Sequence, residues 1–386
     1  MSGMPPATAA TMVPFELVND HVFIDVALNG TGPYHFVFDS GAPFALLDSG
    51  VARELGLSVR AVGTIGGVGD GRAAAGNATV GVVRIGALTL PHAPFVTTDL
   101  TATIGAVEGR RIDGVIGRDI LKRFVTTFDY GQSRIVFGAD VPALADGGAS
   151  LIPLRIVGGI PQIACHIAMI PAVCNVDTGS RLAVTVPAPF AAAHPQVIAQ
   201  TLSALGVDGY GLGGAALGRL GRLSALEFGG FIVRDAVCDY SAQTRGAFAN
   251  PALGANIGGG ILRLFAVTFD YAQHRIALRA ADFGRLEPPD RSGLFLAGRA
   301  DVVRVFDVRP DTPAAAAGIK KDDLVISVDG RAVTPGDLPA IRATLMAPTK
   351  TVVPLVLSRN GHAREVSLAL QDYLPPVGQK ARLRDL

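Results

Sequence analysis

Two carboxylates stand in matching surroundings at distant points of the chain. Asp39 lies in FVFDSGAPF and Asp177 in VCNVDTGSR, each directly after an apolar run that is typical of a strand. Two carboxylates in contact cannot both ionise, so they would share one proton. The ionised member would take a proton from water, while the protonated member donates one to a carbonyl oxygen. Each aspartate is followed by a hydroxyl residue and a glycine, namely Ser40 and Gly41, and Thr178 and Gly179.

A single Asp-Ser/Thr-Gly triplet is weak evidence, because the same residues suit an ordinary turn. The surrounding sequence strengthens it, because the chain repeats itself in the same order and with nearly equal spacing. The first copy reads VFIDVALNG, FVFDSGAPF, TIGGVGDG, DGVIGRDIL and FVTTFDYGQSRIVF, and the second reads PQIACHIAM, CNVDTGSRL, YGLGGAALG, ANIGGGILR and FAVTFDYAQHRIAL. We interpret this as a duplicated unit with lobes at residues 13–140 and 150–281. A pseudo-two-fold axis between the lobes would set Asp39 against Asp177.

The composition favours a compact, mainly β protein. The chain has 386 residues, of which 49% are hydrophobic, and this length suits two or three domains with substantial cores. Short runs rich in Val, Ile, Phe and Thr alternate with Gly, Pro, Asn and Asp, a pattern that predicts strands and hairpins. Helix signals are few. The clearest is residues 48–57, where Asp48 or Ser49 would cap the helix and Gly56 would end it.

Charge and targeting signals exclude some functions. The formal charge is +1 and the arginines are scattered, so we expect no nucleic-acid partner. No run approaches the roughly 18 apolar residues that span a bilayer, so we expect no membrane span. The first residues, MSGMPPATAATM, lack the basic and apolar regions of a signal peptide. Localisation therefore stays open, with a periplasmic or secreted protein as the suspected class.

The three cysteines are Cys165, Cys174 and Cys238. This small, odd number argues against a disulfide framework. A hairpin turn at residues 169–171 would bring Cys165 and Cys174 roughly opposite each other, which would permit a bridge. We expect instead that the cysteines are small buried apolar side chains.

On the repeat and its DSGA and DTGS motifs, residues 13–281 resemble the aspartic proteases. Retroviral-type members of that family pair two single-lobed chains, and pepsin-like members carry both lobes in one chain, as here. The resemblance implies a mainly β fold of duplicated acid-protease-type barrel lobes. It also implies an endopeptidase that acts on peptides or unfolded proteins, uses no cofactor or metal, and works as a monomer.

The resemblance assigns roles to individual residues. Asp39 and Asp177 would activate the water molecule that attacks the peptide bond. The later apolar-apolar-glycine segments at 115–117 and 256–258 would lock the two loops. The residues that support the catalytic loops would be Ser40, Gly41, Thr178 and Gly179.

Members of the family close glycine-rich β-hairpins, called flaps, over the bound peptide. Corresponding segments stand in both repeats, which resembles the retroviral pattern of two flaps. Glycine would permit left-handed backbone and a mobile hairpin there. The flap residues would be Ile65, Gly66, Gly67, Val68 and Gly69 in the first lobe, and Leu212, Gly213 and Gly214 in the second. Neither flap has the tyrosine of the pepsin flap at an obvious position, so flap chemistry is not transferred.

After a polar linker at 282–291, residues 292–374 resemble a bacterial PDZ domain, a small α+β module. The most specific stretch is VRPDTPAAAAGIKKDDLVISVDG at 308–330, in which Thr312 would cap a short helix. In PDZ domains a peptide adds as a strand and its C-terminal carboxylate binds backbone N–H groups. The peptide-binding residues would be Gly293, Leu294, Phe295 and Leu296, opposite a helix at 337–346. This segment lacks the second glycine of the family's Gly-Leu-Gly-Phe loop.

Other functions fit less well. A dehalogenase-like phosphatase needs a second aspartate two residues after the first, where Gly41 and Gly179 stand. No serine-nucleophile elbow or HExxH or CxxC motif is present, and the seven histidines fit no catalytic set. Asp129 and Asp270 of the repeated FDY are predicted to be structural turn acceptors. One alternative stays open, a two-lobed peptide-binding protein that kept the cleft and lost turnover.

Overall fold

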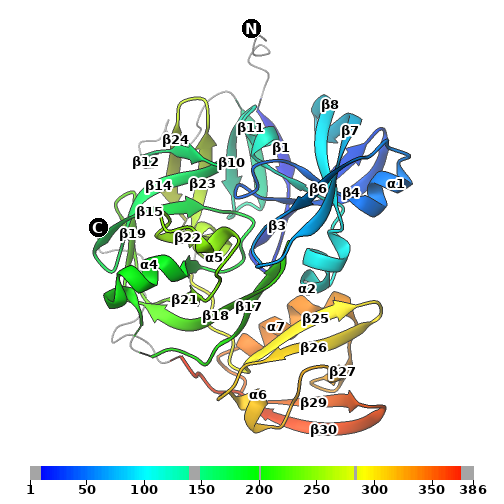
Figure 1. Ribbon diagram of the computed structural model, residues 1–386, viewed down its shortest axis with the longest axis vertical. Helices are drawn as coiled ribbons and strands as arrows, with labels where there is room; N and C mark the ends of the chain where they lie inside the picture. Colours follow the sequence, from blue (N-terminus) through cyan, green and yellow to red (C-terminus); the bar gives the residue numbers. More distant parts are fainter. Residues whose placement is uncertain (1–9, 139–147, 200, 282–284, 375–386) are drawn as a thin grey trace.

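The computed structural model describes residues 10–138, 148–199, 201–281 and 285–374, and these residues form a mainly β protein (Figure 1). Parts of three predictions lie outside the described residues: the start of the chain (1–9), the end of the first lobe (139–140) and part of the linker (282–284). Among the described residues, none of the helices combines the length and the apolar character needed to cross a membrane.

A six-stranded sheet joins the two halves of the repeat. Its strands are β1 (Thr11–Pro14), β11 (Arg134–Gly138), β10 (Val125–Asp129), β23 (Phe265–Asp270), β24 (Arg275–Ala280) and β12 (Ser150–Pro153), in that order across the sheet. At its centre β10 pairs antiparallel with β23, so that Thr127 lies opposite Thr268 with their hydroxyls 2.8 Å apart. Phe128 and Phe269 pack edge to face beside them, with ring centroids 5.8 Å apart. The two FDY strands therefore form the seam between the halves.

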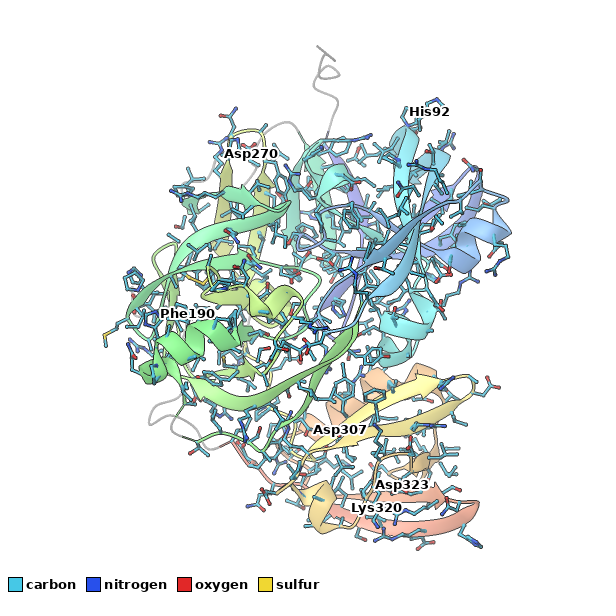
Figure 2. All side chains as sticks on the ribbon, in the orientation of Figure 1. His92, Phe190, Asp270, Asp307, Lys320 and Asp323 are labelled. Carbon is cyan, nitrogen blue, oxygen red and sulfur yellow. A yellow bond between two sulfur atoms is a disulfide. The ribbon has the colours of Figure 1, made fainter. Side chains whose placement is uncertain are left out.

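The FDY aspartates end their strands as turn acceptors. Asp129 accepts a hydrogen bond from the Gln132 backbone N–H at 3.2 Å. Asp270, labelled in Figure 2, accepts one from the Gln273 N–H at 3.0 Å and one from Arg275 Nε at 2.9 Å. The prediction of a structural role for both is confirmed.

The first half builds an eight-stranded sheet beside this seam (Figure 1). Its strands, in sheet order, are β2 (Glu16–Val18), β3 (His21–Leu28), β4 (Thr31–Phe38), β9 (Gly114–Ile116), β5 (Leu46–Asp48), β8 (Leu88–Thr98), β7 (Ala73–Ile85) and β6 (Arg60–Ile65). Its helical segments are α1 (Ser49–Glu54), the π-helical η1 (Thr101–Gly105), α2 (Ala106–Glu108) and α3 (Arg118–Leu121). Asp48 caps α1 by accepting from the Gly50 N–H at 2.8 Å, as predicted.

The second half builds a ten-stranded sheet. In sheet order it contains β17 (Gly206–Gly211), β18 (Gly214–Leu223), β21 (Ala236–Ser241), β16 (Val184–Val186), β22 (Ala255–Ile257), β15 (Ile170–Val176), β14 (Ile160–Ile167), β19 (Leu226–Phe228) and β20 (Phe231–Val233), with β13 (Arg155–Val157) beside β14. Its helical segments are α4 (Ala188–Ala193), η3 (Pro195–Val197), η4 (Ala247–Ala249) and α5 (Gly259–Leu262).

The prediction that the cysteines are unbridged is wrong for two of them. Cys165 and Cys174 form a disulfide across the β14–β15 hairpin, with Cα atoms 6.0 Å apart. The hairpin register pairs Cys165 with Ala172, so the cysteines are diagonal neighbours rather than directly opposite. Cys238 is a buried free thiol, as expected.

The C-terminal part forms its own sheet below the other three in Figure 1. It contains β25 (Leu294–Arg299), β26 (Val302–Val308), β27 (Leu324–Val328), β28 (Arg331–Ala332), β29 (Val352–Arg359) and β30 (His362–Ala369), with the helices α6 (Pro313–Ala316), η5 (Pro335–Asp337) and α7 (Leu338–Met346). Thr312 stands at the start of α6, but its hydroxyl donates to the Arg309 carbonyl and does not cap the helix. The predicted side-chain cap is therefore wrong.

Two separate apolar cores match this division. One core runs through both halves of the repeat and includes the fully buried Phe38, Phe128 and Phe269. The C-terminal sheet has its own core, with Val303 and Ile341 among its buried members. Because each part buries enough apolar surface for a core of its own, the C-terminal part is packed as a distinct module.

Candidate active site

Asp39 and Asp177 leave their strands in the same way. Strand β4 pairs in parallel with β9, and the Asp39 N–H donates to the Ile116 carbonyl at 3.0 Å. Strand β15 pairs in parallel with β22, and the Asp177 N–H donates to the Ile257 carbonyl at 2.9 Å. The segments expected to lock the loops at 115–117 and 256–258 therefore hold the backbone of both aspartates.

The glycines that end these locking segments are needed for close packing. A Cβ atom at Gly117 would overlap the Phe44 carbonyl, and one at Gly258 would overlap the Leu182 carbonyl. Each locking segment thus lies directly against the turn that follows the aspartate loop of its own half.

The DSGA loop (39–42) and the DTGS loop (177–180) hold each other by reciprocal hydrogen bonds. The Ser40 N–H donates to Thr178 Oγ1 at 3.0 Å, and the Thr178 N–H donates to Ser40 Oγ at 3.0 Å. Each hydroxyl also donates to the opposite strand end, Ser40 to the Val176 carbonyl at 2.8 Å and Thr178 to the Phe38 carbonyl at 3.0 Å. Both side chains are fully buried. Four bonds between two loops fix their relative position.

The carboxyl groups meet at the centre of this arrangement. A Cβ atom at Gly41 would lie 2.5 Å from Asp177 Oδ1, and one at Gly179 would overlap the carboxyl of Asp39. Only glycine therefore admits the carboxyl of the opposite loop. Burial, followed by the charge of Asp177 and a hydrogen bond to it, raises the pKa of Asp39 well above its usual range. The structure brings the two predicted residues into contact.

The two carboxyls have different hydrogen-bond partners. Asp177 accepts from the Gly179 N–H through Oδ1 and from Asn256 Nδ2 through Oδ2, both at 2.9 Å. Asp39 Oδ1 is buried and has no hydrogen-bond partner among the described residues. Both oxygens of Asp177 thus accept hydrogen bonds, while burial and the neighbouring carboxylate raise the pKa of Asp39 and favour its protonated form.

Sequence reasoning treated Asn256 only as part of an apolar-apolar-glycine segment. The corresponding residue of the first half is Val115, so the repeat itself holds a signal: a buried amide replaces an apolar side chain at one of two equivalent places.

The two predicted flaps contact each other. Residues 66–72 join β6 to β7, and residues 212–213 join β17 to β18. The Gly69 N–H donates to the Leu212 carbonyl at 3.0 Å, and the Gly71 N–H donates to the Gly213 carbonyl at 2.9 Å. The first flap also contacts the second half directly, because Gln243 Nε2 donates to the Val68 carbonyl at 3.2 Å.

The flap glycines serve two different needs. Gly213 and Gly214 have φ values of +87° and +98°, as expected for left-handed backbone. Gly66, Gly67 and Gly69 do not have positive φ, so that expectation is wrong for the first flap. Gly67 and Gly69 are required by contact instead, since a Cβ at Gly67 would lie 2.8 Å from the Leu212 carbonyl oxygen.

A buried histidine contacts the DTGS loop, and sequence reasoning missed it. His21 Nε2 lies 2.9 Å from the Gly179 carbonyl oxygen, and His21 Nδ1 lies 3.3 Å from Glu108 Oε1. Burial opposes charge on both side chains, but their mutual attraction is stronger. The pKa of His21 is raised from 6.5, and that of Glu108 is lowered to about 2. His21 directly precedes the repeated segment VFIDVALNG, whereas its partner Glu108 on α2 lies far in the sequence from any motif.

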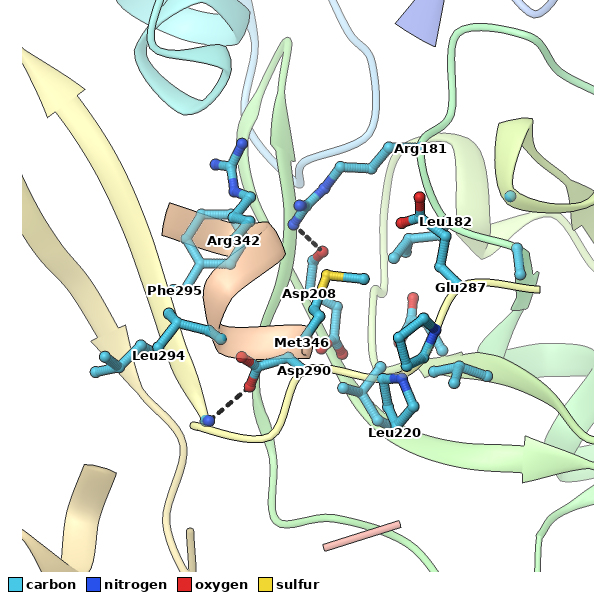
Figure 3. A pocket seen from close by; sticks show the side chains of 18 of the residues that line it. Arg181, Leu182, Asp208, Leu220, Glu287, Asp290, Leu294, Phe295, Arg342 and Met346 are labelled. Carbon is cyan, nitrogen blue, oxygen red and sulfur yellow. Dashed lines mark hydrogen bonds between the residues drawn. The ribbon is translucent and has the colours of Figure 1, made fainter. Parts of the chain in front are cut away.

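The predicted PDZ peptide-binding residues line a cavity together with residues from the two halves of the repeat. The cavity has a volume of about 210 Å³. Figure 3 shows the side chains that surround it, from three parts of the chain: Arg181, Asp208, Leu294, Phe295, Arg342 and Met346. Arg181 follows the DTGS loop, and its guanidinium lies 5.4 Å from the ring centroid of Phe295 on β25. The groove between β25 and α7 is therefore covered by the rest of the molecule.

The loop expected to bind a C-terminal carboxylate is already occupied by a carboxylate of this chain. Asp290 accepts from the Gly293 N–H at 2.6 Å and from the Ser292 N–H at 3.1 Å. The Leu294 N–H donates to Ser292 Oγ at 3.0 Å. These three N–H groups are not free for a ligand in this arrangement.

Among residues 10–138, 148–199, 201–281 and 285–374, no three His, Cys, Asp or Glu side chains gather as a metal site.

Comparison with known proteins gives matches at both ends of the chain. Residues 24–120 match a family model described as aspartyl protease, and residues 304–359 match a model described as PDZ domain. DNA damage-inducible protein 1 of Neurospora crassa is 27% identical over 129 residues, which cover 32% of this chain and 27% of that protein. The chain thus matches about a quarter of the length of this relative. It carries an aspartyl-protease segment that includes Asp39 and, at its other end, a PDZ domain.

Proposed function

We propose that this chain, with its aspartyl-protease segment and its PDZ domain, is an endopeptidase that hydrolyses peptide bonds with water activated by Asp39 and Asp177. The observation that carries the proposal is the contact of the two carboxyls between loops that Ser40 and Thr178 brace reciprocally. A structural pair of aspartates would not need such bracing. Two contacting acids that share a proton suit a reaction in which one accepts and the other donates.

The different environments of the two acids suggest their roles. Asp177, with donors to both oxygens, acts as the base that takes a proton from water. Asp39, whose pKa is raised, acts as the acid that donates a proton to the carbonyl oxygen of the scissile bond. As the C–N bond of the tetrahedral gem-diol breaks, Asp177 gives its proton to the leaving nitrogen and Asp39 takes one from a gem-diol hydroxyl, so the two carboxyls end in their starting states.

We further propose the domain division of the chain. The lobes are residues 13–140 and 150–281, related by duplication and an approximate two-fold axis, and residues 282–291 link them to a PDZ domain at 292–374. The matching parallel pairs β4–β9 and β15–β22 and the central seam of β10 with β23 support this division. Because both aspartates come from one chain, the proposed enzyme is complete as a monomer.

The substrate is proposed to be an extended peptide held beneath the two flaps. Its main chain would pair with the hairpins as an added strand does. The flap tips are hydrogen-bonded to each other, so they must separate for a peptide to enter. Ile65 and Leu212 pack in one apolar cluster at the flaps, so we expect apolar residues on either side of the cut.

The test is digestion of an unfolded protein by the full chain at several pH values, with Asp39→Asn and Asp177→Asn beside the wild type. We expect cleavage by the wild type and a loss of at least about a thousandfold in each variant. Asp25→Asn, at an exposed carboxyl of the same half, should cleave normally. Cleavage that survives in both variants would refute the mechanism, and saturable peptide binding without cleavage would establish the peptide-binding alternative.

A further inference from the structure

His21 is the one histidine of the described chain that reaches an aspartate loop. It opens strand β3, and its ring is buried between the DTGS loop and helix α2. The contact with the Gly179 carbonyl matters because the N–H of the same residue donates to Asp177 at 2.9 Å. A shift of this glycine would therefore move a donor of the carboxyl that acts as base in the proposed reaction.

The second half of the repeat has no such residue. Ile160 opens strand β14 as His21 opens β3, and it carries no hydrogen-bonding group. The turn before β14 lies beside the residue that follows the DSGA loop, where Gly159 packs against Pro43. The DTGS loop thus has a hydrogen-bond contact with a histidine, whereas the equivalent contact of the first half is apolar.

Helix α2 supplies the anion that holds His21. Glu108 is 1% exposed, accepts from Asn19 Nδ2 at 2.7 Å, and lies 3.3 Å from His21 Nδ1. With both ring nitrogens facing oxygens, the imidazole is suited to be a doubly protonated cation. A three-residue helix has little stability of its own, so its position depends on what it packs against.

The PDZ domain is that support. Val107 of α2 is buried in a cluster with Phe295 and Ala297 of strand β25. Arg342 of α7 donates to the Val107 carbonyl and, at 3.3 Å, to the Leu296 carbonyl. The backbone of Gly109 directly after α2 lies against the Pro335 carbonyl, where no side chain would fit. Helix α2 is therefore clamped by the groove side of the PDZ domain.

We propose that His21 is a positioning residue for the DTGS loop, and that the docked PDZ domain holds it in place through Glu108 of helix α2. This inference rests on the proposed peptidase function. It gives the PDZ domain a second task besides peptide binding, which is to complete the support of the second aspartate loop. Release of the domain would loosen α2, then the ion pair, then Gly179.

Other charges around His21 are accounted for. Its own strand end carries Asp20, which is paired with Arg263 at 2.9 Å, and Arg263 also contacts Glu287. Arg181 of the segment after the DTGS loop repels a charged His21, and Asp39 of the DSGA loop is affected by it. Arg342 faces Glu108 from the PDZ side. Among these, Glu108 is the carboxylate within contact distance of the ring.

The expected effect on pH dependence follows from the sign of the charge. A cationic His21 lowers the pKa of Asp39 and so favours loss of its proton. Without that charge Asp39 keeps its proton to higher pH. The alkaline limb of the rate profile, which reports this proton, should therefore move upward by a fraction of a pH unit, since burial and Asp177 affect the pKa of Asp39 more than His21 does. A residue that merely filled space would lower activity at all pH values without moving the limb.

The test compares kcat and its pH profile in full-length variants. We expect His21→Phe, His21→Gln and Glu108→Gln all to move the alkaline limb upward, because each removes the cation or its partner. His21→Phe, which also removes the donor to Gly179, should lose the most in kcat, about tenfold or more. The matched control is His35→Gln, at an exposed pair with Asp25 on the same half, which should change neither quantity.

The link to the PDZ domain has its own variant. Arg342→Met should lower kcat about twofold or more, while Arg331→Met on the exposed strand β28 should not. Unchanged kcat and an unmoved alkaline limb in all of the His21 and Glu108 variants, beside an active wild type, would overturn the inference and leave the peptidase proposal standing.

A readout without activity separates the two proposals. In NMR spectra of the full chain, the His21 imidazole should titrate above 6.5 in the wild type and below its wild-type midpoint in Glu108→Gln. Even if the wild type cleaves no substrate, this titration still shows whether His21 and Glu108 form an ion pair. An identical midpoint in both proteins would contradict the inference whatever the activity.

Discussion

At the scale of single residues, the two aspartates are distinguished by what surrounds them and not by their motifs. DSGA and DTGS are nearly the same sequence, and each carboxyl lies against the glycine of the opposite loop. Asn256 adds a donor on one side only, where Val115 stands on the other. We therefore propose Asp177 as the base, because the amide of Asn256 has no counterpart in the first half of the repeat.

Replacing Asn256 by Val, the residue of the first half, tests that assignment. The change removes a donor to a carboxylate, which stabilises the ion by roughly 1.5–3 kcal/mol. Activity requires this carboxylate to be ionised, so the acidic limb of the kcat/KM profile should move to higher pH by about one unit or more. The alkaline limb should stay in place. An acidic limb that does not move would show that Asn256 does not tune the pair.

The aspartates, their hydroxyl neighbours and the locking segments were predictable because the repeat places them at equivalent positions. Ser40 and Thr178 brace the loops as expected. His21 and Glu108 were not predictable, since the contact between them joins residues far apart in the sequence and neither lies in a motif. The sequence permitted the Cys165–Cys174 bridge but favoured unbridged cysteines, because a small, odd number of cysteines argues against a disulfide framework and says nothing about a local hairpin pair.

At the scale of elements, the flaps illustrate the same limit. The sequence predicts the two glycine-rich hairpins, but it does not show why the first flap needs glycine. They allow backbone to approach backbone across the two halves, which no single-strand pattern reveals. The mainly β class followed from short apolar runs and turn residues, whereas the order of strands in three sheets depends on contacts between distant segments.

Gly67→Ala should interfere with flap closure. The added methyl would meet the Leu212 carbonyl, so the two tips cannot take their present positions. We expect a rise in KM and a fall in kcat of about tenfold together, because closure both holds the peptide and excludes water. Gly66→Ala is the matched control in the same loop, since its methyl would meet only the flexible end of Arg72 at 3.6 Å. Equal kinetics for the two variants would contradict the role of the tip contact.

The disulfide should stabilise the second half. It closes a loop with a sequence separation of 9 in the β14–β15 hairpin, and β15 leads directly into the DTGS loop. For a loop of this length the bond contributes about 2–3 kcal/mol in the chain-entropy picture. The double variant Cys165→Ala/Cys174→Ala should therefore unfold at lower denaturant concentration. Reductant should have the same effect on the wild type and none on the variant, and a reductant-insensitive wild type would show that the bond does not contribute.

At the scale of the whole molecule, the PDZ domain packs against the rest of the chain through specific contacts and is not joined to it by the linker alone. Arg309, 4% exposed, enters the second half and donates to Ser203 Oγ at 3.0 Å, to the Ala204 carbonyl, and to the carboxylate of Asp208. Asp307, labelled in Figure 2, accepts from the Val207 N–H of the flap strand β17 at 2.9 Å. The same domain contacts helix α2 of the first half. It therefore touches both halves and one flap strand.

Arg309→Met should release this docking. The change leaves Asp208 buried beside Asp239, whose pKa burial and Asp208 raise well above its usual range. Loss of one partner from a buried pair costs roughly 3–5 kcal/mol. We expect a lower thermal midpoint and faster proteolysis in the linker at 285–291, whereas Arg304→Met, at an exposed pair with Asp322, should resemble the wild type. Linker cleavage at the wild-type rate would show that Arg309 does not hold the domain.

Our central proposal is that the carboxyls of Asp39 and Asp177 share one proton. The most direct measurement is the carbon-13 NMR titration of aspartate carboxyls in the full chain, with Asp39→Asn and Asp177→Asn to assign the signals. We predict that burial and the charge of Asp177 raise the pKa of the Asp39 carboxyl well above its usual range, and that Asp177→Asn lowers this pKa by removing the neighbouring charge. Two carboxyls that titrate independently near 4, unmoved by either substitution, would contradict the account.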